Sequence, residues 1–199
     1  MRRKFRFIVS ETLVARARDL ATCIMCEDPD RVRHLGAVAE RAAALSVTVP
    51  ATMVDTLVAS GWLHDIGYAP ALRQTGFHPL DGARYLRGQG WPEPVCALVA
   101  HHSGSRFVAR ICGLDGALRE FEFVEDAPSD VLTVADNTAG HDGSLVTMSA
   151  RLRQKLQRHG PDWPGARANP ERDDYIRAAA HRVVQRLASM GRTDAYLDL

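Results

Sequence analysis

Several histidines and aspartates in this chain stand where polar side chains are costly to bury. The clearest case is residues 59–68, an apolar run that ends in the adjacent pair His64-Asp65, with Gly67 close behind. An imidazole and a carboxylate at the buried end of a helix need a partner, and a divalent metal ion suits both groups. Similar positions are held by His34, His78, His101, His102 and Asp136. Such side chains on facing helices form metal sites in helical bundles.

The spacing of apolar residues predicts the helices that would hold these side chains. It predicts helices over 12–25, 31–45, 50–65, 79–88, 95–100, 130–138, 149–158 and 171–190. Ser10 and Asp30 are the expected N-caps of the first two. His34 then faces inward from the first turn of the second helix. Residues 121–124 alternate in polarity, which favours a short strand or an extended loop. The expected fold class is all-α.

Composition points to an ordinary soluble protein with one domain. The 199 residues are 46% hydrophobic and 25% charged, and the net charge of +1 favours neither a stable nucleic-acid partner nor a membrane surface. No apolar run approaches the ~20 residues that span a bilayer. Four cysteines suit a reducing compartment, so we expect a cytoplasmic protein. Acidic residues gather in 114–142 and basic ones in 151–199, which leaves a homo-oligomer open.

The order H…HD…D, with the pair in Leu63-His64-Asp65-Ile66-Gly67, resembles the HD-domain superfamily of metal-dependent phosphohydrolases. The resemblance covers roughly residues 30–140. It implies an HD-domain-like helical bundle at 30–140, preceded by a helical extension (1–29) and followed by C-terminal helices (141–199) packed on the same domain. The core metal ligands that it implies are His34, His64, Asp65 and Asp136.

The segments around His78 and His101-His102 resemble the six-ligand branch of that superfamily, which binds two metal ions. Consecutive helical residues point about 100° apart, so His64 can serve one ion while Asp65 bridges both. His78 and His101 would complete the second ion. His101 is preferred as the ligand because Ser103-Gly104 follows at the family's offset, while His102 is a ligand, a supporting group or a substrate contact.

The resemblance implies hydrolysis of a phosphoester, of nucleotide type, by a hydroxide that bridges two metal ions. Asp65 and His102 are the catalytic candidates, with His102 protonating the leaving oxygen. Candidates for binding a small phosphorylated substrate are Tyr68 and the arginines near the ligand segments, Arg73, Arg84 and Arg106. Iron or manganese is favoured, and mixed nitrogen and oxygen ligands also accept zinc, nickel, cobalt or magnesium.

Two other functions follow from the same residues. Tyr68 stands where many hydrolytic relatives carry a lysine. The tyrosine removes a permanent cation, so a diiron oxygenase acting on a small polar substrate is the first alternative. A degenerate HD domain that serves as a sensor or scaffold is the second. It predicts the loss of one or more ligands, whereas all six are present.

Overall fold

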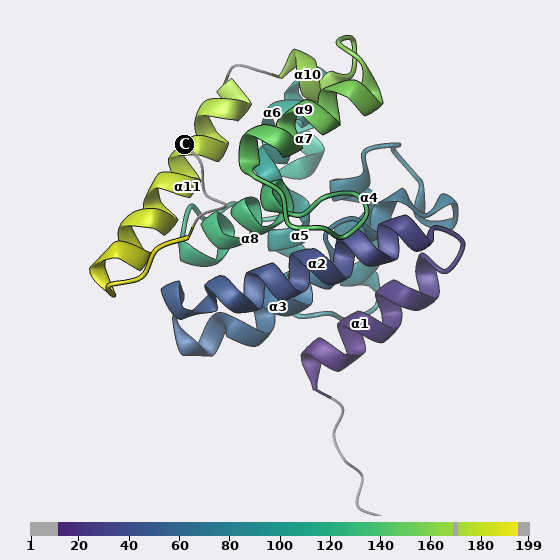
Figure 1. Cartoon of the computed structure of the whole chain (residues 1–199). Helices are drawn as coiled ribbons and strands as arrows, with labels where there is room; N and C mark the ends of the chain where they lie inside the picture. Colours follow the sequence, from purple (N-terminus) through teal and green to yellow (C-terminus); the bar gives the residue numbers. More distant parts are fainter. Residues whose placement is uncertain (1–11, 169–170, 195–199) are drawn as a thin grey trace, which may run out of the picture.

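The computed structural model describes residues 12–168 and 171–194, and it confirms the all-α fold class (Figure 1). The described ranges contain no strand, only an isolated bridge between Ala139 and Leu145. None of the helices in these ranges has the length and apolarity to cross a bilayer. The α-helices are α1 (Leu13–Ile24), α2 (Pro29–Leu45), α3 (Val54–Leu63), α4 (His78–Gly88), α5 (Glu93–His101), α6 (Ser105–Ile111), α7 (Asp115–Leu118), α8 (Ala127–Thr138), α9 (Met148–His159), α10 (Pro164–Arg167) and α11 (Glu171–Ser189).

Short 3₁₀ turns join several of these helices. They are η1 (Ser46–Thr48), η2 (Ala51–Met53), η3 (Ile66–Tyr68), η4 (Pro70–Leu72) and η5 (His102–Gly104). The helix predicted from Pro50 thus begins as a 3₁₀ turn and becomes α-helical only at Val54. Residues 121–124 run without regular structure in the connection to α8, so the loop interpretation of this segment is correct.

The N-caps of the first two helices are Thr12 and Asp28, whereas the sequence predicted Ser10 and Asp30. The Thr12 side chain accepts a hydrogen bond from the Ala15 N–H and caps α1, while Ser10 lies outside the described residues. Asp28 caps α2 by accepting from the Arg31 N–H. Pro29 occupies the first position of that helix, where no hydrogen bond is lost. Asp30 lies in the first turn, where its charge favours the helix N-terminus.

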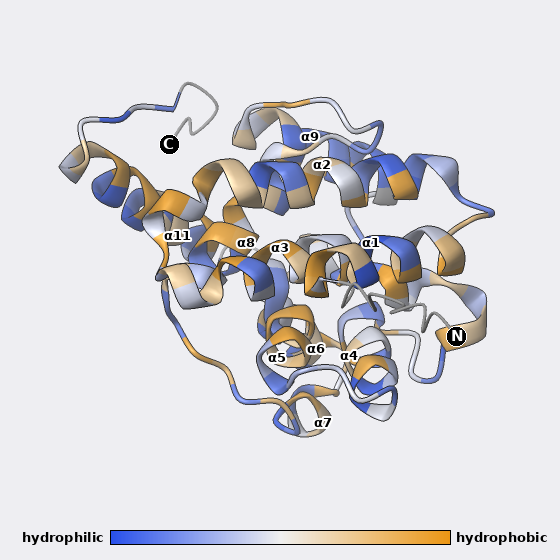
Figure 2. Cartoon of the chain, turned by 90° about the horizontal axis from the view of Figure 1, so that it is seen from below, coloured by the Kyte–Doolittle hydropathy of each residue, from blue (hydrophilic) through white to orange (hydrophobic). Residues whose placement is uncertain are grey.

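The bundle is organised around α3 and α8. Helix α3 packs against α1, α2 and α5, and α8 packs against α2 and α11. The residues of α8 from Pro128 to Thr138 are all buried, so this helix has no solvent-facing side over that span. Figure 2 shows apolar residues on α5 and α8 as well as on the helices around them. Every side chain that leaves the buried end of α3 or α8 therefore enters the interior.

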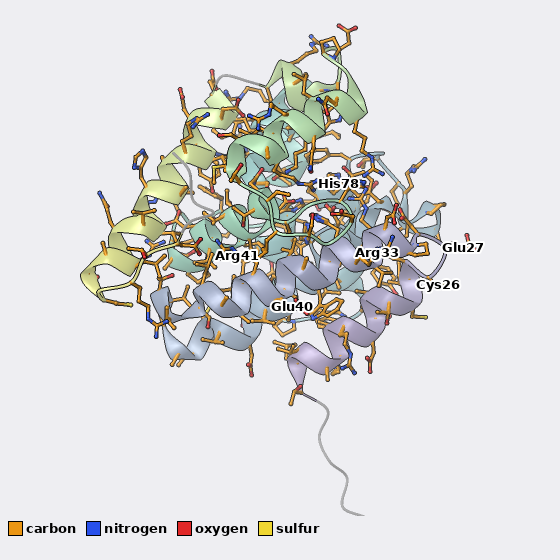
Figure 3. The ribbon with its side chains drawn as sticks, viewed as in Figure 1. Cys26, Glu27, Arg33, Glu40, Arg41 and His78 are labelled. Carbon is orange, nitrogen blue, oxygen red and sulfur yellow. The ribbon has the colours of Figure 1, made fainter. Side chains whose placement is uncertain are left out.

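Cys23 and Cys26, which have C-x-x-C spacing, lie away from this interior. Cys23 and Cys26 are exposed and free. Figure 3 shows Cys26 and Glu27 at the turn between α1 and α2, on the outside of the molecule.

Candidate metal centre

Three of the predicted ligands form one compact group at the centre of the bundle. The Nε2 atom of His34 lies 3.3 Å from Oδ1 of Asp136, and Nε2 of His64 lies 4.0 Å from the same oxygen. All three side chains are buried. Helix α2 and the end of α3 thus each place one histidine nitrogen beside the carboxylate that α8 provides. Such a group can hold a metal ion.

A second group, formed by Asp65, His78 and His102, lies beside the first. Oδ1 of Asp65 is 3.1 Å from Nε2 of His78 and 3.5 Å from Nε2 of His102. The other oxygen, Oδ2, is 3.5 Å from Nε2 of His64 and 3.8 Å from Nε2 of His34. The two oxygens of Asp65 therefore face the two groups separately, which is the arrangement that a bridging carboxylate requires.

The histidine rings are fixed so that their Nε2 atoms point inward. Backbone carbonyls lie 2.7–2.9 Å from Nδ1 of His34, His64 and His102, namely those of Gly140, Gly61 and Val99. A carbonyl only accepts, so each Nδ1 carries the proton and each Nε2 keeps its lone pair. Such second-shell bonds orient histidine ligands in metal sites.

His64 provides the strongest local indication that the site fits a cation. Its Nε2 is buried and has no hydrogen-bond partner within the described part of the chain. The lone pair instead faces carboxylate oxygens of Asp65 and Asp136, and acceptors that face one another repel unless positive charge lies between them. Burial lowers the pKa of His64 to about 3, against the opposing effect of Asp65. A proton on the ring does not fill this role at neutral pH, whereas a divalent cation would.

His102, and not His101, enters the second group, so the preference for His101 is corrected. Helix α5 ends at His101, and at His102 the backbone leaves the helical region with ψ 148°. His101 turns away from the site, with Nε2 2.9 Å from the Phe121 carbonyl and its ring against Phe123. The family offset alone could not reveal this change of direction.

The turn after His102 is held in an uncommon backbone conformation. Ser103 has φ 50° and ψ 34°, in the left-handed region that non-glycine residues seldom adopt. Its hydroxyl donates to Oδ2 of Asp136 and accepts from the Asn137 amide, 3.0 Å away. Its carbonyl accepts from Nε of Arg172 at 2.9 Å. These bonds hold the strained residue next to the proposed ligands, as is common at functional sites.

Basic side chains neutralise both carboxylates. Nη1 of Arg31 lies 2.5 Å from Oδ2 of Asp65, and Nζ of Lys155 lies 3.0 Å from Oδ2 of Asp136. Burial would raise the pKa of Asp65, but the Arg31 guanidinium beside it holds this pKa well below its usual range, since the His64 ring is neutral at neutral pH. Burial likewise opposes the ionised form of Asp136, and the charge of Lys155 outweighs it, so the pKa of Asp136 also lies well below its usual range. Both aspartates are thus anionic and able to bind cations.

His78 is positioned by the loop that precedes α4. Asp81, one turn further along the helix, is fully buried and accepts hydrogen bonds from the backbone N–H groups of Gln74, Thr75 and Gly76. In Figure 3 His78 lies between α2 and the C-terminal helices. Its ring stacks on that of Tyr68, with centroids 3.8 Å apart. Burial lowers the pKa of His78 to about 4, against hydrogen bonding to Asp65, so this ring is also neutral.

The predicted substrate residues have different positions. Tyr68 lines the cavity in front of the two groups, and Arg31 lies over its ring at 4.3 Å. Arg73 is exposed and Arg84 pairs with Glu120, and neither lines this cavity. Arg106 lies over the Phe123 ring at 4.1 Å, also away from the cavity. Proximity in sequence to the ligands was thus a poor guide to which arginines face the site.

The cations that do line the cavity were missed. They are Arg31, Arg151, Lys155, Arg158 and Arg172. Arg31 could have been found, because it precedes His34 by three residues on one helix and so shares its face. The others belong to the C-terminal helices, and nothing in their own sequence shows which face of α9 or α11 turns toward residues so far along the chain.

A comparison with family models agrees with this geometry. Residues 31–140 match the model of the HD domain, and this stretch contains all six residues of the two groups. No curated protein and no solved structure matches the chain significantly. The match to the HD domain covers more than half of the 199 residues, and the chain therefore belongs to the HD domain family.

Proposed function

We propose that the protein is a metal-dependent phosphohydrolase of the six-ligand branch, which holds two divalent transition metal ions. His34, His64 and Asp136 would hold one ion, and His78 and His102 the other, with Asp65 shared. The observation that carries this proposal is the division of the two Asp65 oxygens between the two groups. Iron and manganese are the preferred ions, since both accept mixed imidazole and carboxylate ligands.

Bound divalent ions in such a site supply a hydroxide nucleophile at neutral pH and stabilise negative charge on a phosphoryl group. The protein's own contribution is charge and order around that group. Arg31 and Lys155 keep the carboxylates ionised. Tyr68 remains a neutral hydrogen-bond donor, because burial and then Asp65 raise the pKa of its phenol. This donor borders the cavity where the substrate would lie.

The proton-donor role first given to His102 does not fit its environment. Its Nδ1 proton is engaged by the Val99 carbonyl at 2.7 Å, and its Nε2 faces Asp65 and His78. Both ring nitrogens are thus engaged within the site, and neither is directed at a leaving oxygen. We therefore assign His102 to metal binding and leave it out of the acid–base steps.

Metal stoichiometry tests the shared carboxylate. Asp65→Ala should lose both ions because both groups use it, whereas Asp136→Ala should lose one. Elemental analysis after gel filtration gives the counts. Asp130→Ala is the matched control, since Asp130 is a second buried carboxylate of α8 that pairs with Arg182 rather than with a histidine. Two ions retained in Asp65→Ala would contradict the bridging assignment.

The reaction class is tested separately. Protein loaded with Mn²⁺ under anaerobic conditions should release phosphate from one or more members of a panel of nucleotides and sugar phosphates. Protein loaded with Fe²⁺ should show no substrate-dependent oxygen uptake. Oxygen consumption without phosphate release would instead support a diiron oxygenase.

A further inference from the structure

The cavity in front of the metal centre is larger than a phosphate needs, and the C-terminal helices form part of its wall. Its volume is about 640 Å³, which suits a ligand of nucleotide size. Figure 1 shows α9 and α10 on the same side of the molecule as α6, and α10 packs on α6. The residues that these helices contribute to the cavity lie beyond residue 140, outside the stretch that matches the HD domain.

Helix α9 directs a row of basic residues along this cavity. Arg151, Lys155 and Arg158 are spaced by four and three residues, so they share one face of the helix. Arg151 and Lys155 approach Asp136, at 3.7 and 3.0 Å. Arg158 is one turn further out, is exposed, and forms no ion pair with any residue in the described ranges. The positive charge of the row thus exceeds what Asp136 neutralises.

Arg172 differs from the other basic residues of the cavity wall because it is buried and has no ion-pair partner among the described residues. Only 6% of it is exposed, and its Nε donates to the Ser103 carbonyl. No carboxylate of the described residues forms a salt bridge with it, and its two Nη atoms make no hydrogen bond to them. Burying a guanidinium without an anion is expensive. Burial accordingly lowers the pKa of Arg172, whereas Asp65 outweighs burial at Arg31 and raises it there.

The charge balance of the cavity shows what would complete it. Five basic side chains and two carboxylates of the described residues line it, and divalent ions would add further positive charge. One phosphoryl group at the metal centre leaves Arg172 and Arg158 without an ion pair among the described residues. Only the more distant charges of Asp136 and Asp173 favour the charged form of Arg172. A planar guanidinium binds phosphate or carboxylate through two parallel hydrogen bonds. The Trp163 ring, 5.9 Å from the Arg172 guanidinium, borders the same space.

We propose that Arg172 and Arg158 form a second anion subsite, so that the substrate is a phosphorylated small molecule with at least two anionic groups. One phosphate would lie at the histidine–aspartate centre and the second group, a phosphate or a carboxylate, at the two arginines. This inference rests on the proposed function for the first phosphate only. It predicts that the protein prefers substrates whose second anionic group, which takes no part in the reaction, can bind to the two arginines.

Binding of matched ligand pairs to the metal-loaded protein tests the subsite. Calorimetric titration would compare adenosine 5′-monophosphate with adenosine 3′,5′-bisphosphate, and glycerol 3-phosphate with 3-phosphoglycerate. The first pair adds a phosphate and the second a carboxylate. We expect the added group to tighten binding about tenfold or more in at least one pair, as one bidentate charged contact would. Equal affinities within both pairs would overturn the proposal.

Variants identify the residues responsible. Arg172→Gln should erase the preference. The preference is the ratio of the two affinities within a pair, so it is read independently of any change in affinity that follows from losing the bond to the Ser103 carbonyl. Arg158→Gln, on an exposed side chain that folding does not require, should reduce the preference several-fold. Arg110→Gln is the control: it removes an arginine that pairs with Glu171, next to Arg172, outside the cavity. If Arg172→Gln and Arg158→Gln both retain the full preference, the arginines are not the subsite.

Failure of the two proposals can be told apart. If the unmodified protein shows the binding preference, Arg172→Gln abolishes it and no probe releases phosphate, the result supports the subsite and contradicts the hydrolase. Phosphate release from every probe, without a preference in binding, supports the hydrolase and contradicts the subsite. Arg172→Lys keeps the charge and a donor for the Ser103 carbonyl but loses the bidentate contact, so an intermediate preference supports the geometry proposed here.

Discussion

At the scale of single residues, the adjacent histidines at the end of α5 have separate tasks. His102 faces Asp65 and His78, whereas His101 contacts the Phe121 carbonyl. We expect His102→Ala to bind one metal ion in place of two. His101→Ala should keep both ions and lose about 1 kcal/mol of stability with its hydrogen bond, a fall in Tm of ~2–4 °C.

Elemental analysis and thermal denaturation of the two variants check this prediction. Each variant serves as the control for the other, since both remove an imidazole from neighbouring positions. Loss of metal in His101→Ala with full occupancy in His102→Ala would restore the assignment made from the sequence alone.

The difference between these two residues shows what a sequence can and cannot specify about a site. His34, His64 and Asp65 could be placed because apolar periodicity and residue type define the inward face of a regular helix. His102 could not, because its direction depends on the backbone leaving the helix there and on Ser103 adopting a left-handed conformation. That conformation is maintained by Asp136, Asn137 and Arg172, which are distant in sequence.

At the scale of elements, the approach of η3 to α4 determines where Asp65 and His78 meet. Gly67 in η3 lies so close to α4 that a Cβ atom would be 2.0 Å from the His78 carbonyl oxygen and 2.7 Å from the Gly82 N. Both are backbone atoms and cannot move without displacing the helix. Gly67 is thus required for contact between the segments that bear the two groups.

Gly67→Ala should therefore destabilise the fold by roughly 2 kcal/mol or more through overpacking and weaken binding of the ion held by His78. Gly88→Ala is the matched control, because that glycine lies at the end of α4, the helix that Gly67 contacts, with open space around it. It should be neutral or stabilise by ~0.5–1 kcal/mol, since alanine favours helix more than glycine does. Denaturant titration compares the two, and equal stabilities would contradict the close-packing argument.

The helices themselves were more predictable than their mutual arrangement. Regular apolar spacing located each long helix to within a few residues, including α2 and α8, which carry His34 and Asp136. Caps were less certain, because Asp28 and Asp30 are both suitable and only Asp28 bonds to the Arg31 N–H. The orientation of α9 depends on packing against α8, so Arg151 and Lys155 could not be assigned to the site in advance.

At the scale of the whole molecule, the hydrophobic core crosses both boundaries drawn from the sequence. One cluster joins Ala17 and Ala21 of α1 to Leu63 at the end of α3. A second joins Val38 of α2 and Leu132 of α8 to Met148, Ile176 and Val183 in α9 and α11. Among the described residues, neither the segment before residue 30 nor the one after residue 140 has a core of its own, as an independent domain would need.

We therefore expect the whole chain to unfold in a single cooperative transition, with equal calorimetric and van't Hoff enthalpies. Asp130→Ala provides a local perturbation. Asp130 is buried, and its two oxygens pair with Arg182 at 2.5 Å and Arg186 at 2.8 Å, which ties α8 to α11. Both arginines are partly exposed and can return to water, so the cost should be ~1–3 kcal/mol, below that of a fully buried pair.

If the C-terminal helices belong to the same cooperative unit, this variant lowers the one transition as a whole. Glu171→Gln is the control, since its pair with Arg110 is exposed and should contribute less than ~1 kcal/mol. A separate early transition that involves only residues beyond 140 would contradict the single-domain arrangement. In that case Arg158 and Arg172 would belong to a unit that can open independently, and the cavity would close only when its ligand holds the two parts together.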